Sequence, residues 1–566
     1  MHATPTILRA ALVLGVAATA LVATATWARP AQACGGTFCD LGPQAMPVDQ
    51  SGENILFVLD EGPNGPEVEV HIQIQYEGDP DRFAWVIPLT AVPDLSVGSE
   101  ALFANLLAGT VPTYGLATSN DTCRTGGAFP DARGDAAEGA GFGDDGGLPE
   151  EPMGPQILLQ QTVGAFEITV LSAGGGGVDE VIAWLDANGY QQDPDAAPIL
   201  AQYVAEGALF GAIKLVGGAD IDEIHPIVLR YPGQEPCVPL RLTQIAATED
   251  MQVRTFFLAD DRVVPTNYRH VLVNPLKIDW LALGANYQDV VTAAVDAESA
   301  DGRAFVTEYA GTSDVVARGL ADPRWDANVF ITLTPGMVLD ELQAQGLLAC
   351  YGGPEGCLAQ HPLIEGLLEE FLLTEAVTLG DFFNSPGSYE GLIDWQAIEF
   401  AEAMQTRIVD PAVHADELLD RWPYVTRMFT TISPHEMTTD PIFHVHADLP
   451  EVAAVRQGQR RIRCDGDSLL TLPDGREVYL PSGASWPEFP SQMPWAEAID
   501  ELPLVGAPMV LVDNAAEIDD LLRDYNASVG WPRGCTGCKS ADERPAPASW
   551  LGLLLFGLWA RRRRLP

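Results

Sequence analysis

The segment EVEVHIQIQY, residues 67–76, alternates polar and apolar side chains without a break. A period of two is typical of a β-strand that has one face in a core and the other in water. Residues 55–59 precede this segment across a turn at Asn64-Gly65, and residues 83–88 follow it after a second turn. We therefore predict three consecutive antiparallel strands, the third of which ends at a proline. The polar side chains of the middle strand are expected to face solvent.

Strand-like and helical patterns continue to about residue 335. Ser99 is a suitable N-cap for a helix with apolar residues on one face. Further helices are expected in the ranges 179–188, 198–206 and 287–298. Further strands are expected in the ranges 164–171, 208–216, 225–231, 238–247, 252–258 and 270–274. Residues 115–155 are rich in Gly, Asp, Ala and Pro, so we expect a long disordered loop there.

Residues 336–431 show mainly helical periodicity. An apolar stripe at helical spacing runs from Leu363 to Leu372, and two more helices are expected near residues 395–404 and 417–422. Strand patterns return in residues 460–513. The predicted fold class is α+β, with an antiparallel β-rich N-terminal region with interspersed helices, a helical middle region and a small α+β C-terminal portion.

These patterns suggest a division of the chain into five parts. The expected parts are a signal peptide (1–33), a β-rich domain (34–335, including the loop at 115–155), a mainly helical region (336–460), a small α+β region (461–534) and a C-terminal sorting tail (535–566).

The N-terminus has the features of a secretory signal peptide. Arg9 supplies a positive charge, residues 10–25 are apolar, and Ala31-Gln32-Ala33 fits a cleavage site that would leave Cys34 first in the mature chain. A retained signal anchor and a lipidated Cys34 are the alternatives. The chain is therefore expected to be exported.

The C-terminus carries cysteines at Cys535 and Cys538, an apolar run at residues 548–560 and four consecutive arginines. This order resembles a surface-sorting tail of the MYXO-CTERM type, which implies that one of the two cysteines is a processing or lipidation point. The apolar run is shorter than the ~17–25 residues of a usual membrane-spanning helix, so it either spans a thin membrane or is removed after sorting. Arginines beside such a segment stay in the cytoplasm, which places the preceding chain outside. A sorting protease and the membrane are the expected partners of the tail.

Several uncommon short sequence motifs occur in a characteristic order along the chain. They are ACGGTFC (33–39), PVDQSGE (47–53), FAWVIP (83–88), WLDANGY (184–190) and YVAEG (203–207). Together they resemble the bacterial secreted family called domain of unknown function 2330, over roughly residues 34–350. The segment TRMFTTISPHEM (426–437) also resembles a motif of such proteins. The resemblance implies an exported protein with a β-rich module, and it brings no catalytic residues.

The charge balance is strongly acidic. The chain has 79 Asp and Glu against 31 Lys and Arg, a formal net charge of −48. A surface of this sign repels nucleic acid and anionic lipid, so a nucleic-acid partner is not expected.

Nine cysteines are present, and eight remain if one tail cysteine is used in sorting. In an oxidising compartment an even number of cysteines favours disulfides. Two pairs are close in sequence across glycine-containing loops, namely Cys34 with Cys39 and Cys350 with Cys357. These four residues are the disulfide candidates.

The best candidate metal site in the sequence is a histidine cluster between residues 435 and 448. Its members are His435, Glu436, Asp440, His444, His446 and Asp448. Two imidazoles and a carboxylate would suit zinc, but Thr439 stands where a zincin motif has its second histidine. Calcium is the other ion considered, because the acidic run at residues 143–146 could contact it, but this run lacks the Asp-x-Asp-x-Asp-Gly spacing and the distal Glu of a calcium loop.

Nucleophile elbows, P-loops and dinucleotide-binding motifs are absent from the sequence. We therefore predict an exported, non-catalytic protein of the cell envelope or outer surface, with a structural or binding role. A surface protein or a polysaccharide is its expected partner. The alternative is a secreted metal-dependent hydrolase that uses the cluster from His435 to His446.

Overall fold

The computed structural model describes residues 50–62, 65–74, 84–121, 155–190, 196–216, 224–233, 236–245, 247–351, 356–374 and 377–531. The expected signal peptide, the sorting tail and the cysteines at 34, 39, 535 and 538 lie outside these residues. Residues 122–154 of the expected loop also lie outside them. No helix within the described ranges is both long enough and apolar enough to cross a membrane.

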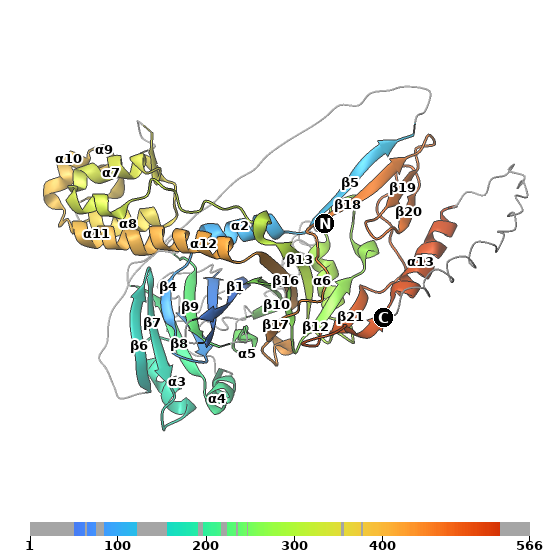
Figure 1. The fold of residues 1–566 in the computed structure, drawn as a ribbon, viewed down its shortest axis with the longest axis horizontal. Helices are drawn as coiled ribbons and strands as arrows, with labels where there is room; N and C mark the ends of the chain where they lie inside the picture. The colour runs from blue at the N-terminus through green and yellow to red at the C-terminus, as the bar shows by residue number, and fades with distance from the viewer. Residues whose placement is uncertain are drawn as a thin grey trace, which may run out of the picture.

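A ten-stranded sheet runs through the middle of the molecule (Figure 1). In spatial order its strands are β22 (Met509–Asp513), β21 (Ala496–Glu501), β12 (Arg269–Val273), β13 (Ala304–Thr312), β16 (Tyr424–Ile432), β10 (Ala247–Ala259), β1 (Gln50–Gly62), β2 (Gly65–Ile74), β9 (Ile227–Pro232) and β4 (Asp94–Val97). β1 with β10 and β12 with β13 are parallel, and the other neighbours are antiparallel.

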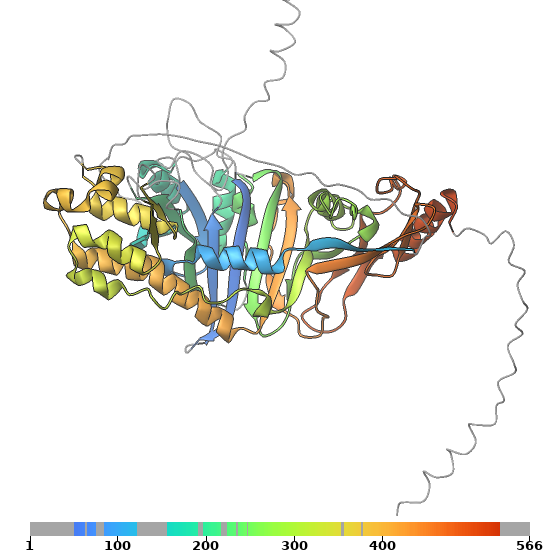
Figure 2. The same ribbon diagram turned by 90° about the horizontal axis from the view of Figure 1, so that it is seen from above.

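The two faces of this sheet are covered differently. On one face, Leu56 and Phe256 pack against helices α2 (Glu100–Thr110) and α12 (Asp410–Arg421), which lie across the strands (Figure 2). On the other face, Phe57 and Val70 pack against a second, four-stranded sheet. Its order is β3 (Ala84–Leu89), β8 (Leu209–Leu215), β7 (Phe166–Ser172) and β6 (Gln156–Val163). The outer face of this second sheet carries α3 (Val178–Ala187) and α4 (Ala196–Glu206).

Two smaller units flank these layers. Short helices pack at one end, with aromatic contacts such as Phe330 to Phe400; the α-helices there are α7 (Pro335–Ala344), α8 (Leu363–Leu372), α9 (Leu379–Asn384), α10 (Pro386–Tyr389) and α11 (Ala397–Met404). At the other end, Trp280 and Leu470 lie in a hydrophobic core between α6 (Tyr287–Val295), α13 (Ala515–Ser528) and a four-stranded sheet. That sheet has the order β20 (Glu477–Leu480), β19 (Ser468–Thr471), β18 (Val455–Ile462) and β5 (Thr113–Asn120).

The remaining elements are short. They are the helix α5 (Leu240–Thr243), the strand pair β11 (Val263–Pro265) with β17 (Phe443–Val445), the strand pair β14 (Leu348–Cys350) with β15 (Cys357–Ala359), the 3-10 turns η3 (Pro275–Lys277), η4 (Ser313–Val315), η5 (Ala327–Thr332), η6 (Glu390–Leu392) and η8 (Pro434–Glu436), and the π-helical segment η7 (Gln405–Val409).

The α+β fold class with a β-rich N-terminal region is confirmed. Several local predictions are confirmed as well, because they rest on signals within one element. Ser99 caps α2 by accepting a hydrogen bond from the backbone N–H of Leu102, and α8 coincides with the apolar stripe at residues 363–372. β1 and β2 form the predicted antiparallel pair.

Three predictions about individual elements are wrong, the first two because a distant segment decides the outcome. β3 does not follow β2 in its sheet, since β9 occupies that position and β3 pairs with β8. Residues 115–120 are not loop, because β5 pairs in parallel with β18. Residues 240–243 are helical, not extended, and follow Pro239, which has no N–H to offer a strand ladder.

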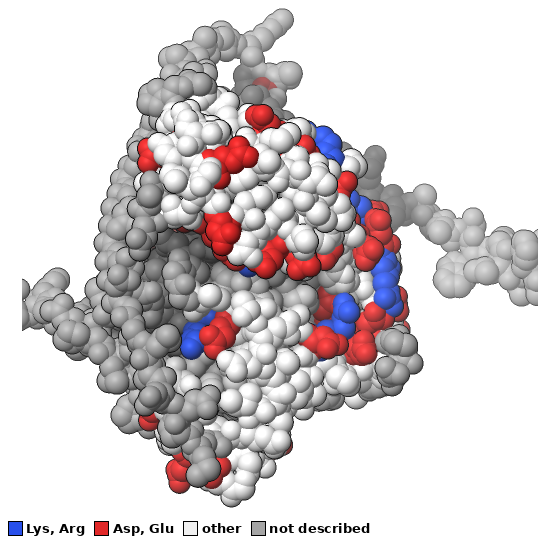
Figure 3. Space-filling view, turned by 90° about the vertical axis from the view of Figure 1, so that its left-hand side faces the viewer, with Lys and Arg blue, Asp and Glu red and all other residues white. Residues whose placement is uncertain are grey.

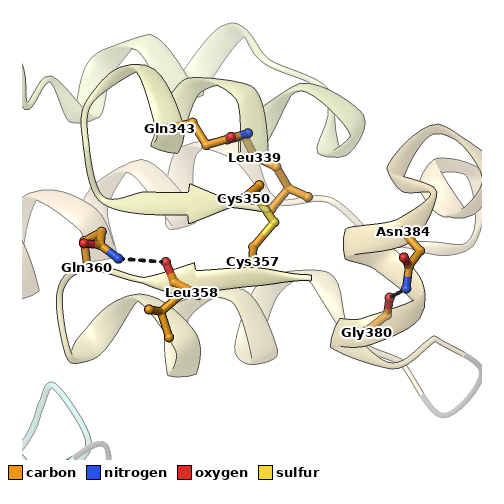
Figure 4. Close-up of a disulfide and its surroundings, with 8 residues drawn as sticks. All are labelled: Leu339, Gln343, Cys350, Cys357, Leu358, Gln360, Gly380 and Asn384. Atoms are coloured by element: carbon orange, nitrogen blue, oxygen red, sulfur yellow. Dashed lines mark hydrogen bonds between the residues drawn. A yellow bond between two sulfur atoms is a disulfide. The ribbon is translucent and has the colours of Figure 1, made fainter. Parts of the chain in front are cut away.

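The predicted disulfide between Cys350 and Cys357 is present and joins β14 to β15 (Figure 4). The two Cα atoms are 3.9 Å apart. Beside it, Gln360 donates a hydrogen bond to the backbone oxygen of Leu358. Cys464 is also disulfide-bonded.

Candidate functional site

The histidines of the expected metal cluster lie in different surroundings. His435 is exposed in η8, and His446 is buried just after β17. His444 contacts Thr266 Oγ1 through Nδ1 at 2.9 Å and the backbone oxygen of Pro503 through Nε2 at 3.2 Å. The rings of His444 and His446 are 6.1 Å apart, and no third ligand joins them among the described residues.

The acidic members of that cluster have other partners. Asp440 accepts hydrogen bonds from Tyr203 Oη at 2.8 Å and from Arg241 Nε at 2.9 Å. Glu436 accepts from the backbone N–H of Ser433 and so closes the first turn of η8. Among the described residues these six side chains therefore do not converge on one point.

A different group converges, and it lies on the strand whose polar face was expected to be wet. Every residue from Val68 to Ile72 in β2 is buried, so that prediction is wrong. Glu69 and His71 are 4 % and 1 % exposed. Their side chains share one face because they are two residues apart on a strand. That face is covered by α12, which comes from more than 300 residues further along the chain.

α12 brings a third ligand-type side chain, His414, to the two on β2. The helix continues from α11 through the π-helical segment η7, in which the N–H of Asp410 bonds the oxygen of Gln405. Pro411 follows at once and offers no N–H, so a regular α-helical ladder cannot continue through this point. π-Helical segments are frequent at functional sites, and this one lies one turn before His414.

All three side chains meet at one carboxylate oxygen. Glu69 Oε1 is 2.7 Å from His71 Nε2 and 2.5 Å from His414 Nε2. The two imidazole rings are stacked, with centroids 6.0 Å apart and 7° between their planes. The ligand atoms lie within 4.8 Å of one another, and no other such group occurs among the described residues.

The other oxygen of Glu69 binds Arg230, which stands directly opposite it in the β2–β9 ladder. Arg230 Nε donates to Glu69 Oε2 at 3.0 Å. Burial alone would raise the pKa of Glu69, but the hydrogen bonds and charges of His414 and His71 outweigh it and hold that pKa well below its ordinary value. Glu69 is therefore an anion at any pH near neutral.

His71 has an orphaned atom on the far side of its ring. Nδ1 is buried and has no hydrogen-bond partner among the described residues. An unsatisfied buried polar atom costs about 1–3 kcal/mol, and it calls for a functional or structural explanation. The buried Nδ1 of His71 therefore lowers the free energy of unfolding unless the site has a further partner for it.

A cavity of about 530 Å³ opens beside the group. His414 and Arg230, whose side chains are 31 % and 45 % exposed, line it together with Asp94, Ser96 and Asp410. Thr162, Gly164 and Thr406 are shared with a second cavity of about 660 Å³ that runs under the helices. This end of the molecule is visibly hollowed between an upper and a lower body, with carboxylates along the rim (Figure 3). The exposed parts of His414 and Arg230 therefore give the group access to this cavity.

Two imidazoles and one carboxylate are a ligand set that zinc and other divalent transition metals accept, with room for a further ligand. An ion at ~2.0–2.2 Å from each atom would replace the two short hydrogen bonds to Glu69 Oε1. Arg230 would remain hydrogen-bonded to the outer oxygen of Glu69, the role that a supporting residue has around a metal ligand. Without an ion, the same residues join β2 to α12 through hydrogen bonds at Glu69.

Sequence reasoning missed this group, although part of its signal was visible. A Glu and a His two residues apart on a strand already point the same way, but the third member has no sequence relation to them. Only the packing of α12 on the sheet identifies it.

Comparison with known proteins places most of the chain in one family. The family model described as "Uncharacterized protein conserved in bacteria (DUF2330)" matches residues 30–444. The matched range extends beyond residues 34–350, over which the sequence motifs resemble the family. It includes Glu69, His71, Arg230 and His414. No curated protein and no solved structure matches the chain.

Proposed function

The chain belongs to the bacterial family of uncharacterized proteins DUF2330, and we propose that it is an exported envelope protein that binds a divalent transition-metal ion through Glu69, His71 and His414. The observation that carries the metal proposal is the convergence of three ligand atoms from β2 and α12 within 4.8 Å. Mixed nitrogen and oxygen donors favour zinc or a similar ion over calcium, which prefers oxygen ligands alone.

The position of the group favours binding with an open coordination site. Three protein ligands leave a fourth position for water or a bound molecule. The cavity lined by His414 and Arg230 provides space on that side. Metal binding requires deprotonated ligands, and the ionised Glu69 already supplies one.

Thermal melting of the purified chain tests the metal proposal. An ion that binds only the folded state at 100 times its dissociation constant adds about 2.7 kcal/mol to the free energy of unfolding. We expect zinc to raise the melting temperature relative to EDTA, and calcium to leave it unchanged. His414→Ala should abolish the zinc effect, whereas the matched variant His444→Ala, in the other histidine pair, should retain it. An equal zinc effect in wild type and His414→Ala would refute the site.

Export is proposed from the two ends of the chain and from its disulfides. The signal-peptide pattern at residues 1–33 and the MYXO-CTERM-type tail with Cys535 and Cys538 point to the cell surface. Disulfides such as Cys350–Cys357 form and persist in oxidising compartments. Labelling of intact cells with a membrane-impermeant amine reagent should reach the native protein. Labelling only after lysis would contradict export.

The proposed role is structural or binding, with a surface protein or a polysaccharide as partner. The acidic composition disfavours nucleic acid. A sorting protease and the membrane are the proposed partners of the tail.

A further inference from the structure

The two edges of the ten-stranded sheet are protected very differently. At one edge, β4 follows Pro93 and carries the exposed Asp94, two features that discourage pairing with another chain. At the other edge lies β22, whose sequence is MVLVD. Within the part of the chain that the structure describes, β22 pairs with β21 alone. Its outer backbone edge is therefore available.

β22 is apolar on both of its faces and exposed on both. Met509 is 54 %, Val510 61 % and Leu511 44 % exposed. Adjacent residues enlarge the patch, since Leu504 is 65 % and Val505 80 % exposed. An exposed, apolar edge strand is a template for pairing with another strand, and natural proteins rarely leave one uncovered.

The charges around this strand favour a second copy of the chain as the partner. Residues 502–512 contain no charged side chain, in a protein with a formal net charge of −48. Two such proteins repel each other over most of their surfaces, and least where both are neutral. Glu501, on the neighbouring strand, is already paired with Arg269 at 2.6 Å. Residues 502–512 therefore offer no carboxylate to a strongly cationic partner, so charge does not favour such a partner here.

The register of such a pairing is also free of like-charge contacts. An edge strand related to its copy by a two-fold axis runs antiparallel to it, which is the geometry of a self-complementary dimer. A pairing that sets Leu511 opposite Leu511 of the copy keeps opposite side chains on the same face, and it places Asp513 of one copy opposite Met509 of the other. The acidic end of β22 thus faces an uncharged residue, and the apolar side chains face each other.

We propose that β22 pairs antiparallel with β22 of a second copy, which joins two ten-stranded sheets into one continuous sheet. The strand is short, and stable interfaces bury roughly 1,200–2,000 Å². The apolar loop around Leu504 and Val505 adds area beside the strand, so the dimer should be reversible and depend on concentration. This proposal is independent of the metal site.

Sedimentation velocity of the chain over a range of concentrations tests the dimer. We expect a reversible monomer–dimer equilibrium in wild type, and only monomer for the double variant Val510→Lys, Leu511→Lys. Leu358→Lys is the matched control, because Leu358 is 60 % exposed on β15, a strand remote from β22, and it should dimerise as wild type does.

A second variant guards against a folding defect in the first. Met509→Pro removes a backbone donor at the start of β22 and should also weaken the dimer, while the melting temperature reports whether the monomer is intact. A wild-type chain that stays monomeric at all concentrations would overturn the proposal. So would a dimer that persists in both folded variants.

Discussion

At the scale of single residues, Glu69 is the side chain that connects the candidate site. One carboxylate binds two imidazoles through one oxygen and a guanidinium through the other. Its place on the polar face of an alternating strand indicates exposure to water, yet the structure buries it. The buried negative charge is tolerated because three partners with hydrogen-bond donors surround it.

Replacing Glu69 with Gln should reveal this arrangement as a pH effect. The unfolded carboxyl has a pKa of 4.5 and the folded one lies well below it. Between these values the unfolded chain binds a proton that the folded chain does not, so the stabilisation is complete above pH 4.5 and is lost as the pH falls below it. In EDTA, Glu69→Gln should lower the free energy of unfolding by about 2–3 kcal/mol at pH 7.

Urea unfolding at several pH values measures this difference, which should shrink below pH 4.5. Glu100→Gln is the control with the opposite sign, because burial raises the pKa of Glu100 against the hydrogen bond from Gln73. A raised pKa makes the contribution of Glu100 fall as the pH rises. A pH-independent effect at Glu69 would mean that its charge is not held by the two histidines.

At the scale of elements, sequence predicted what is local and failed where pairing is distant. α2 has its own N-cap in Ser99, α8 has its own apolar stripe, and the loop between Cys350 and Cys357 has the glycines to turn back on itself. β5 has an ordinary polar composition, and it becomes a strand only because β18 lies beside it. The candidate site could not be predicted for the same reason, since His414 lies 345 residues from Glu69 in the sequence.

The turn between β6 and β7 offers a test at this scale. Gly164 has a φ of 58°, and a Cβ there would lie 2.0 Å from Nε2 of His225. That nitrogen accepts a hydrogen bond from the N–H of Ala165 at 3.1 Å, and burial lowers the pKa of His225 to about 4, which keeps the ring neutral. The turn and the buried imidazole therefore fix each other beside both cavities.

Gly164→Ala should destabilise the protein more than Gly174→Ala does. Gly174 has nearly the same φ, 57°, but its nearest atom to a new Cβ is 3.8 Å away. Both variants carry the ~1–2 kcal/mol penalty of a left-handed backbone. Displacement of His225 should add about 1–3 kcal/mol to the first variant alone. Equal free energies of unfolding in urea would show that the ring moves aside without strain.

At the scale of the whole molecule, the central sheet joins parts that the sequence pattern separates. It takes strands from the expected β-rich, helical and C-terminal regions alike. β16 lies in the helical region of the sequence but pairs with β10 on one side and β13 on the other. Local patterns cannot show this, because both neighbours of β16 lie more than a hundred residues away in the sequence.

The expected N-terminal domain, residues 34–335, should therefore not fold on its own. Removing β16 exposes the ladder edges of β10 and β13 in the middle of the sheet, and it uncovers buried residues such as Val253 and Phe257. Removing α12 also takes His414 and the cover over Glu69. A fragment that lost these parts would bury too little apolar surface to offset its conformational entropy.

Circular dichroism during urea unfolding, together with limited proteolysis, should show a cooperative transition for residues 34–534 and none for residues 34–335. Both fragments lack the signal peptide and the tail, so they differ only in the segments that complete the sheet and its cover. A cooperative, protease-resistant fragment 34–335 would mean that β10 and β13 can pair without β16. The strands of the N-terminal part would then form a sheet of their own, to which the later strands are only added.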